Sequence, residues 1–231
     1  TRHPRFSKQV FLWSTLFVVV PLIYSGKIYE GALLPKLLVL QILMTGLLIL
    51  RFATARNNVP AFPQSPLLIP LGAYLLFLAL SVFQALNRVE SVLQLAHYFS
   101  LALVPLIVMG TLSKNQLISI FRVAAWTGLP VSLIGLAQYF GKDVTILGWQ
   151  LSHIPSNANP SATFFHRNAA AGYLLGVIPM AWICFRLSPT PSKTAAYAGL
   201  LALMGTYLVY TRTRGAWVGF IVAVLITVVL A

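Results

Sequence analysis

The sequence predicts an all-α fold, a polytopic bundle of transmembrane helices. Hydrophobic residues make up 58% of the 231 residues and charged residues 8%, whereas soluble chains carry about 25% charged residues. The chain has 16 Lys and Arg against three Asp and Glu, a net charge of +13. In a soluble domain this charge would favour nucleic-acid binding. Here the basic residues are dispersed at the ends of apolar runs, so we predict a membrane protein and no nucleic-acid partner.

Eight apolar runs are candidates for spanning helices, because a helix needs about 20 apolar residues to cross a bilayer. The second run accommodates Pro35 and Lys36 because both fall in its first helical turn. No soluble domain and no repeat interrupts the runs. We therefore expect a single transmembrane domain over residues 1–231, with about eight spans. In chain order the runs cover residues 10–24, 32–50, 67–85, 92–109, 117–140, 169–185, 195–210 and 216–231.

The basic residues of the connections predict the orientation. If the N-terminus is cytoplasmic, nine of the 16 Lys and Arg face the cytoplasm and seven face outward. We therefore expect a cytoplasmic N-terminus. The first run is expected to be a retained helix, because no small-x-small cleavage site follows it. The outer set is unusually basic and requires an explanation; it comprises Lys27, Lys36, Arg88, Lys142, Arg167, Arg212 and Arg214.

Residues 211–219 read Thr-Arg-Thr-Arg-Gly-Ala-Trp-Val-Gly and join the last two apolar runs. A charged side chain in lipid costs roughly 2.5–3.5 kcal/mol on insertion scales, so Arg212 and Arg214 need a reason to be there. Snorkelling to the headgroups is the simplest explanation. Their alternation with threonines, beside Gly215 and Trp217, instead favours an anion-binding corner. A guanidinium group matches phosphate oxygens with two parallel hydrogen bonds.

The longest polar connection, residues 141–168, is expected to be an extracytoplasmic loop that carries function. It ends on His166, Arg167 and Asn168, directly before a helix start of small residues. These side chains and the helix N-terminus would suit an anion. Equally, Asn168 would cap the helix while His166 and Arg167 lie among the headgroups. Metal-ligand spacing is missing, so we predict no metal and no cofactor. His97, inside the fourth run, is expected to be neutral and hydrogen-bonded to a neighbouring helix.

Two short motifs carry a resemblance to a known family. Residues 161–174, Ser-Ala-Thr-Phe-Phe-His-Arg-Asn-Ala-Ala-Ala-Gly-Tyr-Leu, resemble the segment G-T-F-x-H/N-x-N-x-x-A-G-Y-L of the O-antigen ligase/polymerase superfamily. Residues 211–217 resemble its T-x-S-R-G-A-W/L signature, with Thr213 where Ser is usual. Residues 29–36 resemble a first outer loop of such proteins. The resemblance implies a GT-C-like helical bundle that continues past Ala231, with a catalytic His in that further part. The catalytic residue of this chain is therefore unknown.

The resemblance implies a membrane glycosyltransferase of the bacterial inner membrane. Such proteins transfer a glycan from undecaprenyl pyrophosphate to an acceptor, such as the lipid A–core sugar, on the periplasmic face. The pyrophosphate left behind carries negative charge that fixed guanidinium groups can stabilise without a metal. We predict that Arg214 contacts the pyrophosphate, helped by Arg212 and Arg167. Arg88 is a weaker candidate. The predicted pocket-lining residues are His166, Asn168, Trp217 and Lys142.

Two other classes of protein stay open. A transporter for bicarbonate, another anion or a lipid-linked substrate explains the outer basic residues equally well, although the inverted repeats common in transporters are not visible. A non-catalytic membrane subunit of a larger complex is the second class. The acceptor also stays open, so the sequence does not separate a ligase from a polymerase or an oligosaccharyltransferase.

Overall fold

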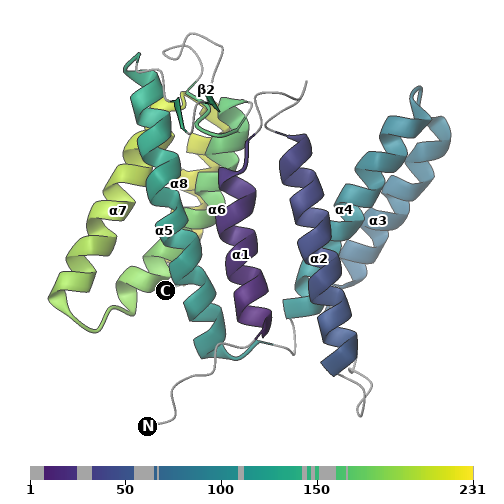
Figure 1. Ribbon diagram of the computed structural model, residues 1–231, viewed down its shortest axis with the longest axis horizontal. Coiled ribbons are helices and arrows are strands. Elements are labelled where there is room, and N and C mark those ends of the chain that lie inside the picture. Colours follow the sequence, from purple (N-terminus) through teal and green to yellow (C-terminus); the bar gives the residue numbers. More distant parts are fainter. Residues whose placement is uncertain are drawn as a thin grey trace.

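The computed structural model describes residues 8–24, 33–54, 65–66, 68–108, 112–141, 145–146, 149–150, 160–164 and 166–230. In this part of the chain, each of the eight apolar runs corresponds to one α-helix, which confirms the all-α class (Figure 1). A single 3-10 turn and a two-stranded antiparallel sheet complete the described elements. In chain order these are α1 (Lys8–Leu22), α2 (Leu34–Thr54), α3 (Leu68–Ser81), η1 (Val82–Gln84), α4 (Arg88–Val108), α5 (Lys114–Tyr139), β1 (Thr145–Ile146), β2 (Trp149–Gln150), α6 (Arg167–Arg186), α7 (Pro191–Tyr210) and α8 (Arg214–Leu230).

The expectation of about eight spans was wrong. Three described helices are long and apolar enough to cross a membrane, Leu34–Ala53 in α2, α5 and α6, and they indicate a membrane protein. Helices α1 and α3 have 15 and 14 residues, about 21–22 Å of helix against a hydrocarbon core of about 30 Å. Helices α4 and α7 reach 21 and 20 residues. Their first turns, however, hold polar side chains, including Arg88 and Glu90 in α4 and Lys193 in α7.

Local signals in the sequence set several helix starts. Ser113 and Gln116 form a capping box at α5: the Ser113 hydroxyl accepts from the Gln116 amide at 3.4 Å, and the Gln116 side chain accepts from the Ser113 amide at 2.9 Å. Thr190 caps α7, and Pro191 takes the first helical position, where its missing N–H costs nothing. These caps lie at the lower end of the bundle in Figure 1.

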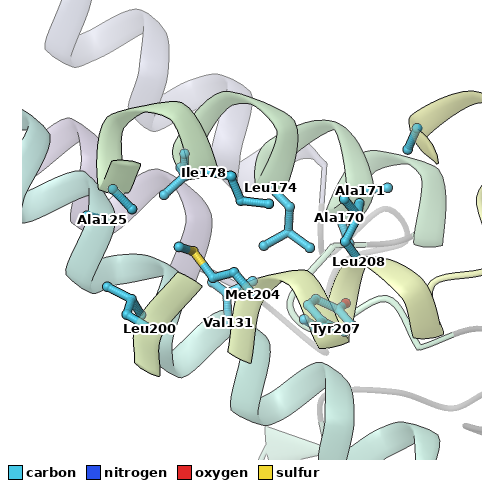
Figure 2. Packing of buried hydrophobic residues seen from close by; sticks show 14 of the residues in the cluster. Ala125, Val131, Ala170, Ala171, Leu174, Ile178, Leu200, Met204, Tyr207 and Leu208 are labelled. Carbon is cyan, nitrogen blue, oxygen red and sulfur yellow. The ribbon is translucent and has the colours of Figure 1, made fainter. Parts of the chain in front are cut away.

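Helices α5, α6 and α7 form the main core of the described chain (Figure 2). Leu174 and Ile178 of α6 point towards Met204 of α7 in that view. Close approach depends on small residues, as in other membrane bundles. A Cβ atom added at Gly135 would overlap the ring of Tyr207 on α7. This tight contact brings the C-terminal half of α5 beside the C-terminal half of α7.

A second apolar cluster joins α1 and α2 to the end of α4 and the start of α5, through buried residues such as Trp13, Met44, Leu47 and Ile107. Helices α3 and α4 form a hairpin on the far side of α2 (Figure 1). No residue of α3 is buried. Helices α1 and α5–α8 therefore form the larger part of the bundle. The α3–α4 hairpin packs beside α2, at the edge of the bundle.

Candidate functional site

The candidate site lies at the upper end of the bundle in Figure 1, where α7 ends and α6 and α8 begin. An open cavity of about 950 Å³ occupies this corner. It brings together five of the residues predicted from the sequence: Arg167, Asn168, Arg212, Arg214 and Trp217. The described residues that line it are Arg167, Asn168, Gly172 and Leu175 from α6, Arg212 and Thr213 from the turn, and Arg214, Gly215, Ala216 and Trp217 from α8.

The turn between α7 and α8 is closed by backbone and hydroxyl hydrogen bonds. The Thr211 amide donates to the Tyr207 carbonyl at 2.9 Å, and the Arg212 amide donates to the Val209 carbonyl at 3.0 Å. The Thr211 hydroxyl, fully buried, donates to the Leu208 carbonyl at 2.7 Å. Arg212 itself has φ +52°, in the left-handed region. Glycine is the usual residue there, and another L-residue costs roughly 1–2 kcal/mol.

The Arg212 guanidinium is held in place by Tyr139, the last residue of α5. Its Nη2 donates to the Tyr139 hydroxyl at 3.0 Å, and its Cζ lies 5.5 Å from the centre of the same ring. Tyr139 in turn packs against Tyr210, with ring centroids 4.3 Å apart. A guanidinium has five N–H donors. The described residues supply no further acceptor for Arg212, so its other donors remain open to a ligand.

Side-chain hydrogen bonds join the starts of α6 and α8. The Thr213 hydroxyl donates to Asn168 Oδ1 at 3.2 Å. The indole N–H of Trp217 donates to the Leu208 carbonyl at 3.2 Å. This bond fixes one edge of the indole against the end of α7 and leaves the side chain 39% exposed along the cavity.

His166, not Asn168, is the N-cap of α6. Its Nδ1 accepts the Asn168 amide at 3.1 Å, while the Asn168 side chain turns to Thr213. The expected cap at Asn168 is therefore wrong, and anion binding at this helix start stays a prediction. The helix has a polar side-chain cap, and Arg167 and Asn168 line the cavity, which His166 does not.

The electrostatics of the corner favour an anion. Three guanidinium groups and the N-terminal ends of two helices meet at one cavity, and helix N-termini carry partial positive charge. Among the described residues no acid lines the cavity, since the single acid of that part of the chain is Glu90, in α4. The Arg214 guanidinium has no hydrogen-bond or ion-pair partner within that part of the chain. This distribution of charge would suit a multiply charged anion with oxygen acceptors.

The segment 160–164 positions the start of α6. The Gln138 side chain accepts from the Ala162 amide at 2.8 Å and donates to the Ala162 carbonyl at 3.0 Å. The Tyr207 hydroxyl donates to the Pro160 carbonyl at 2.7 Å. Ala162 is fully buried with φ +51°. Helices α5 and α7 thus hold the backbone that leads into Arg167.

The structural role of Lys36 was not predicted from the sequence. Lys36 is 7% exposed, and its ammonium group donates to the carbonyls of Val20, Pro21 and Ile23, at 3.1, 2.9 and 2.6 Å. It also lies 4.8 Å from the centre of the Phe164 ring. The hydroxyl of Thr163 donates to the same Pro21 carbonyl. The only signal in the sequence is a lone Lys inside an apolar run, which does not identify its partners.

The remaining predicted residues lie elsewhere. Arg88 begins α4 on the peripheral hairpin, exposed, and does not line the cavity. Lys142 lies outside the described residues. His97 was expected to bond a neighbouring helix, but its buried Nδ1 has no hydrogen-bond partner among the described residues.

The fold and the site together define a helical membrane protein with a basic corner pocket at one end of its bundle. Comparison with known proteins adds no relative: no family model matches the chain, and no curated protein and no solved structure matches it either.

Proposed function

We propose that the chain is a membrane glycosyltransferase of the O-antigen ligase type, and that the corner pocket binds the pyrophosphate of an undecaprenyl-pyrophosphate-linked glycan. The main support is that Arg167, Arg212 and Arg214, from three separate elements, line a single cavity to which no acid of the described residues contributes. The proposal places this end of the bundle at the periplasmic face of the inner membrane and the N-terminus in the cytoplasm.

The resemblance to the O-antigen ligase/polymerase superfamily supports this proposal at the level of single positions. Its two motifs lie at the two halves of the corner, since residues 161–174 lead into and begin α6, and residues 211–217 form the turn and the start of α8. Ala162 stands where the family pattern has Gly, and its φ of +51° is a conformation that Gly favours.

The reaction is a single displacement. The oxygen of an acceptor hydroxyl attacks the anomeric carbon of the glycan, and the bond from that carbon to the pyrophosphate oxygen breaks with inversion. The departing pyrophosphate takes the electron pair, and the arginines stabilise its added charge. A general base takes the acceptor proton; we assign no residue to it. Binding and charge stabilisation are the roles of the described residues.

An anion transporter is less well supported by the geometry. Transporter sites lie near the middle of the membrane, at helices broken there. The basic pocket instead lies at helix ends. A headgroup at the membrane surface reaches such a position while its prenyl chain stays in lipid, as the transferase requires.

Replacement of Arg214 tests the proposal. We expect Arg214→Ala to lower glycan attachment in cells by about 10²–10³-fold, the usual effect of losing one preorganised donor to a developing anion. Arg214→Lys should recover only part of this loss, because an ammonium cannot make the two parallel hydrogen bonds. Attachment is measured by gel mobility of the acceptor in cells without another copy of the gene.

Arg186→Ala is the matched control. Arg186 is an exposed arginine in the last turn of α6, at the opposite end of the same helix from the pocket. Its replacement should leave attachment unchanged at equal protein level. Full attachment with Arg214→Ala would remove the pyrophosphate role of Arg214 and with it the proposal for this pocket.

A further inference from the structure

A second basic cavity lies at the opposite end of the bundle from the corner pocket. Its volume is about 240 Å³, and it is enclosed by α5, the connection between α6 and α7, and the start of α7. These segments meet at the lower end in Figure 1. The side chains that matter for its chemistry are Arg122, Trp126, Ser188, Lys193 and Tyr197.

The two cations of this cavity have no acidic partner among the described residues. The single acid in that part of the chain, Glu90, lies in α4 and does not line the cavity. Neither Arg122 nor Lys193 has a side-chain hydrogen bond or an ion pair in that part of the chain. Two cations facing one cavity repel each other, so an anion between them would relieve an unfavourable interaction.

Arg122 is exposed on the protein surface, but its position along α5 would place its charge within the membrane. Arg122 is the ninth residue of α5, a helix of 26 residues that is long enough to span a membrane. It therefore lies about 12 Å along α5 from the start of the helix. Ionisable residues inside such helices usually mark a binding site or an ion path. A ligand that binds Arg122 at this position must therefore carry apolar groups that can remain in the membrane.

The other walls of the cavity suit a lipid better than a free ion. The rings of Trp126 and Tyr197 lie 5.8 Å apart, and Trp126 is 43% exposed beside Arg122. Trp and Tyr side chains prefer the level of the headgroups. Basic pockets between helices on the cytoplasmic side bind anionic headgroups. The phosphate group of a phospholipid can bind the two cations while its acyl chains cover the indole of Trp126.

We propose that the cavity lined by Arg122, Lys193 and Trp126 is a binding site for an anionic phospholipid, whose phosphate group lies between the two cations. The lipid occupies the leaflet opposite the corner pocket and holds the α6–α7 connection against α5. This site is separate from the glycan-transfer reaction and does not depend on it.

Native mass spectrometry of the full chain in detergent, titrated with phosphatidylglycerol, tests this site. The variants are Arg122→Gln and Lys193→Gln, each of which removes one cation. We expect each to weaken retention of one phosphatidylglycerol roughly fivefold. Lys193 is exposed in the first turn of α7, so its variant gives an answer even if Arg122→Gln folds poorly.

Lys114→Gln and Arg186→Gln are the controls, because both residues lie at the same end of the bundle but outside the cavity. Both should retain phosphatidylglycerol as the unmodified chain does. Phosphatidylcholine should bind more weakly than phosphatidylglycerol, and inorganic phosphate should not displace the lipid. Retention by both cavity variants at the level of the controls would overturn the proposal, and displacement by inorganic phosphate would assign the cavity to a free anion instead.

Discussion

Arg212 occupies a backbone position that glycine would fill at a lower free-energy cost. Its φ of +52° places it just past the end of α7, where the chain turns towards α8. The Arg212 side chain nevertheless donates a hydrogen bond to Tyr139 and lines the corner pocket. A residue that is unfavourable for the turn but directed at a binding pocket is a marker of function. We interpret Arg212 as retained for its guanidinium.

Replacement of Arg212 by glycine separates these two effects. Arg212→Gly should leave the protein as stable as before, or stabilise it by about 1 kcal/mol, because the left-handed strain is relieved. The same change should weaken pyrophosphate binding by about tenfold, because it removes a charged donor. Thermal unfolding in detergent measures the first effect, and a binding titration measures the second.

Ala162→Gly is the matched control for this prediction. Ala162 has almost the same φ, +51°, but is fully buried and carries no charge. It should leave pyrophosphate binding unchanged and alter stability by less than about 1 kcal/mol, because relief of the strain offsets the loss of one buried methyl group. Equal binding by Arg212→Gly and the unmodified chain would show that Arg212 has no part in the site.

At the scale of whole elements, Lys36 joins three parts of the chain. It belongs to α2, its carbonyl partners lie at the end of α1, and Phe164 belongs to the segment before α6. The last carbonyls of a helix have no intrahelical partner, and a cation there is favourable. Lys36 therefore caps the C-terminal end of α1 and holds this helix against segment 160–164, which leads to the corner pocket.

Lys36→Met should destabilise the protein by roughly 1–3 kcal/mol, because it leaves buried carbonyls without a donor while conserving most of the apolar volume. Thermal unfolding in detergent provides the measurement. Lys114→Met replaces an exposed lysine at the start of α5, and such a surface change should stay within about 0.5 kcal/mol. An equal effect of the two substitutions would contradict the structural role of Lys36.

The sequence predicted the helices well, because each apolar run produced a helix at nearly the expected place. The run 169–185 corresponds to α6, Arg167–Arg186, and the run 117–140 to α5, Lys114–Tyr139. The caps at Ser113 and Thr190 extend helices beyond the apolar run itself. The number of spans was overestimated because apolar character alone does not give helix length. Helices α1 and α3 end before they reach the thickness of a bilayer.

At the scale of the whole molecule, the contacts that build the site join distant parts of the sequence. Thr213 bonds Asn168 across 45 residues, and Arg212 bonds Tyr139 across 73. Arg167, Arg212 and Arg214, which the sequence analysis grouped together, line one cavity, whereas the weaker candidate Arg88 does not. Arg88 lies at the same end of the bundle and yet belongs to the peripheral hairpin. Which helices become neighbours depends on long-range packing, such as that of Gly135 against Tyr207. No local sequence pattern predicts such a contact.

Pyrophosphate binding is best tested by a substitution that fills the corner pocket without disturbing the core. A Cβ added at Gly172, which lines the cavity, or at Gly199, on α7 away from it, meets no atom within 4 Å. The measurement is equilibrium binding of a short-chain prenyl pyrophosphate to the full chain in detergent. The unmodified chain and Gly199→Phe should bind it saturably and alike, and Gly172→Phe at least about tenfold more weakly, a loss of about 1.4 kcal/mol. Equal binding by all three, or no binding by the unmodified chain, would contradict the account.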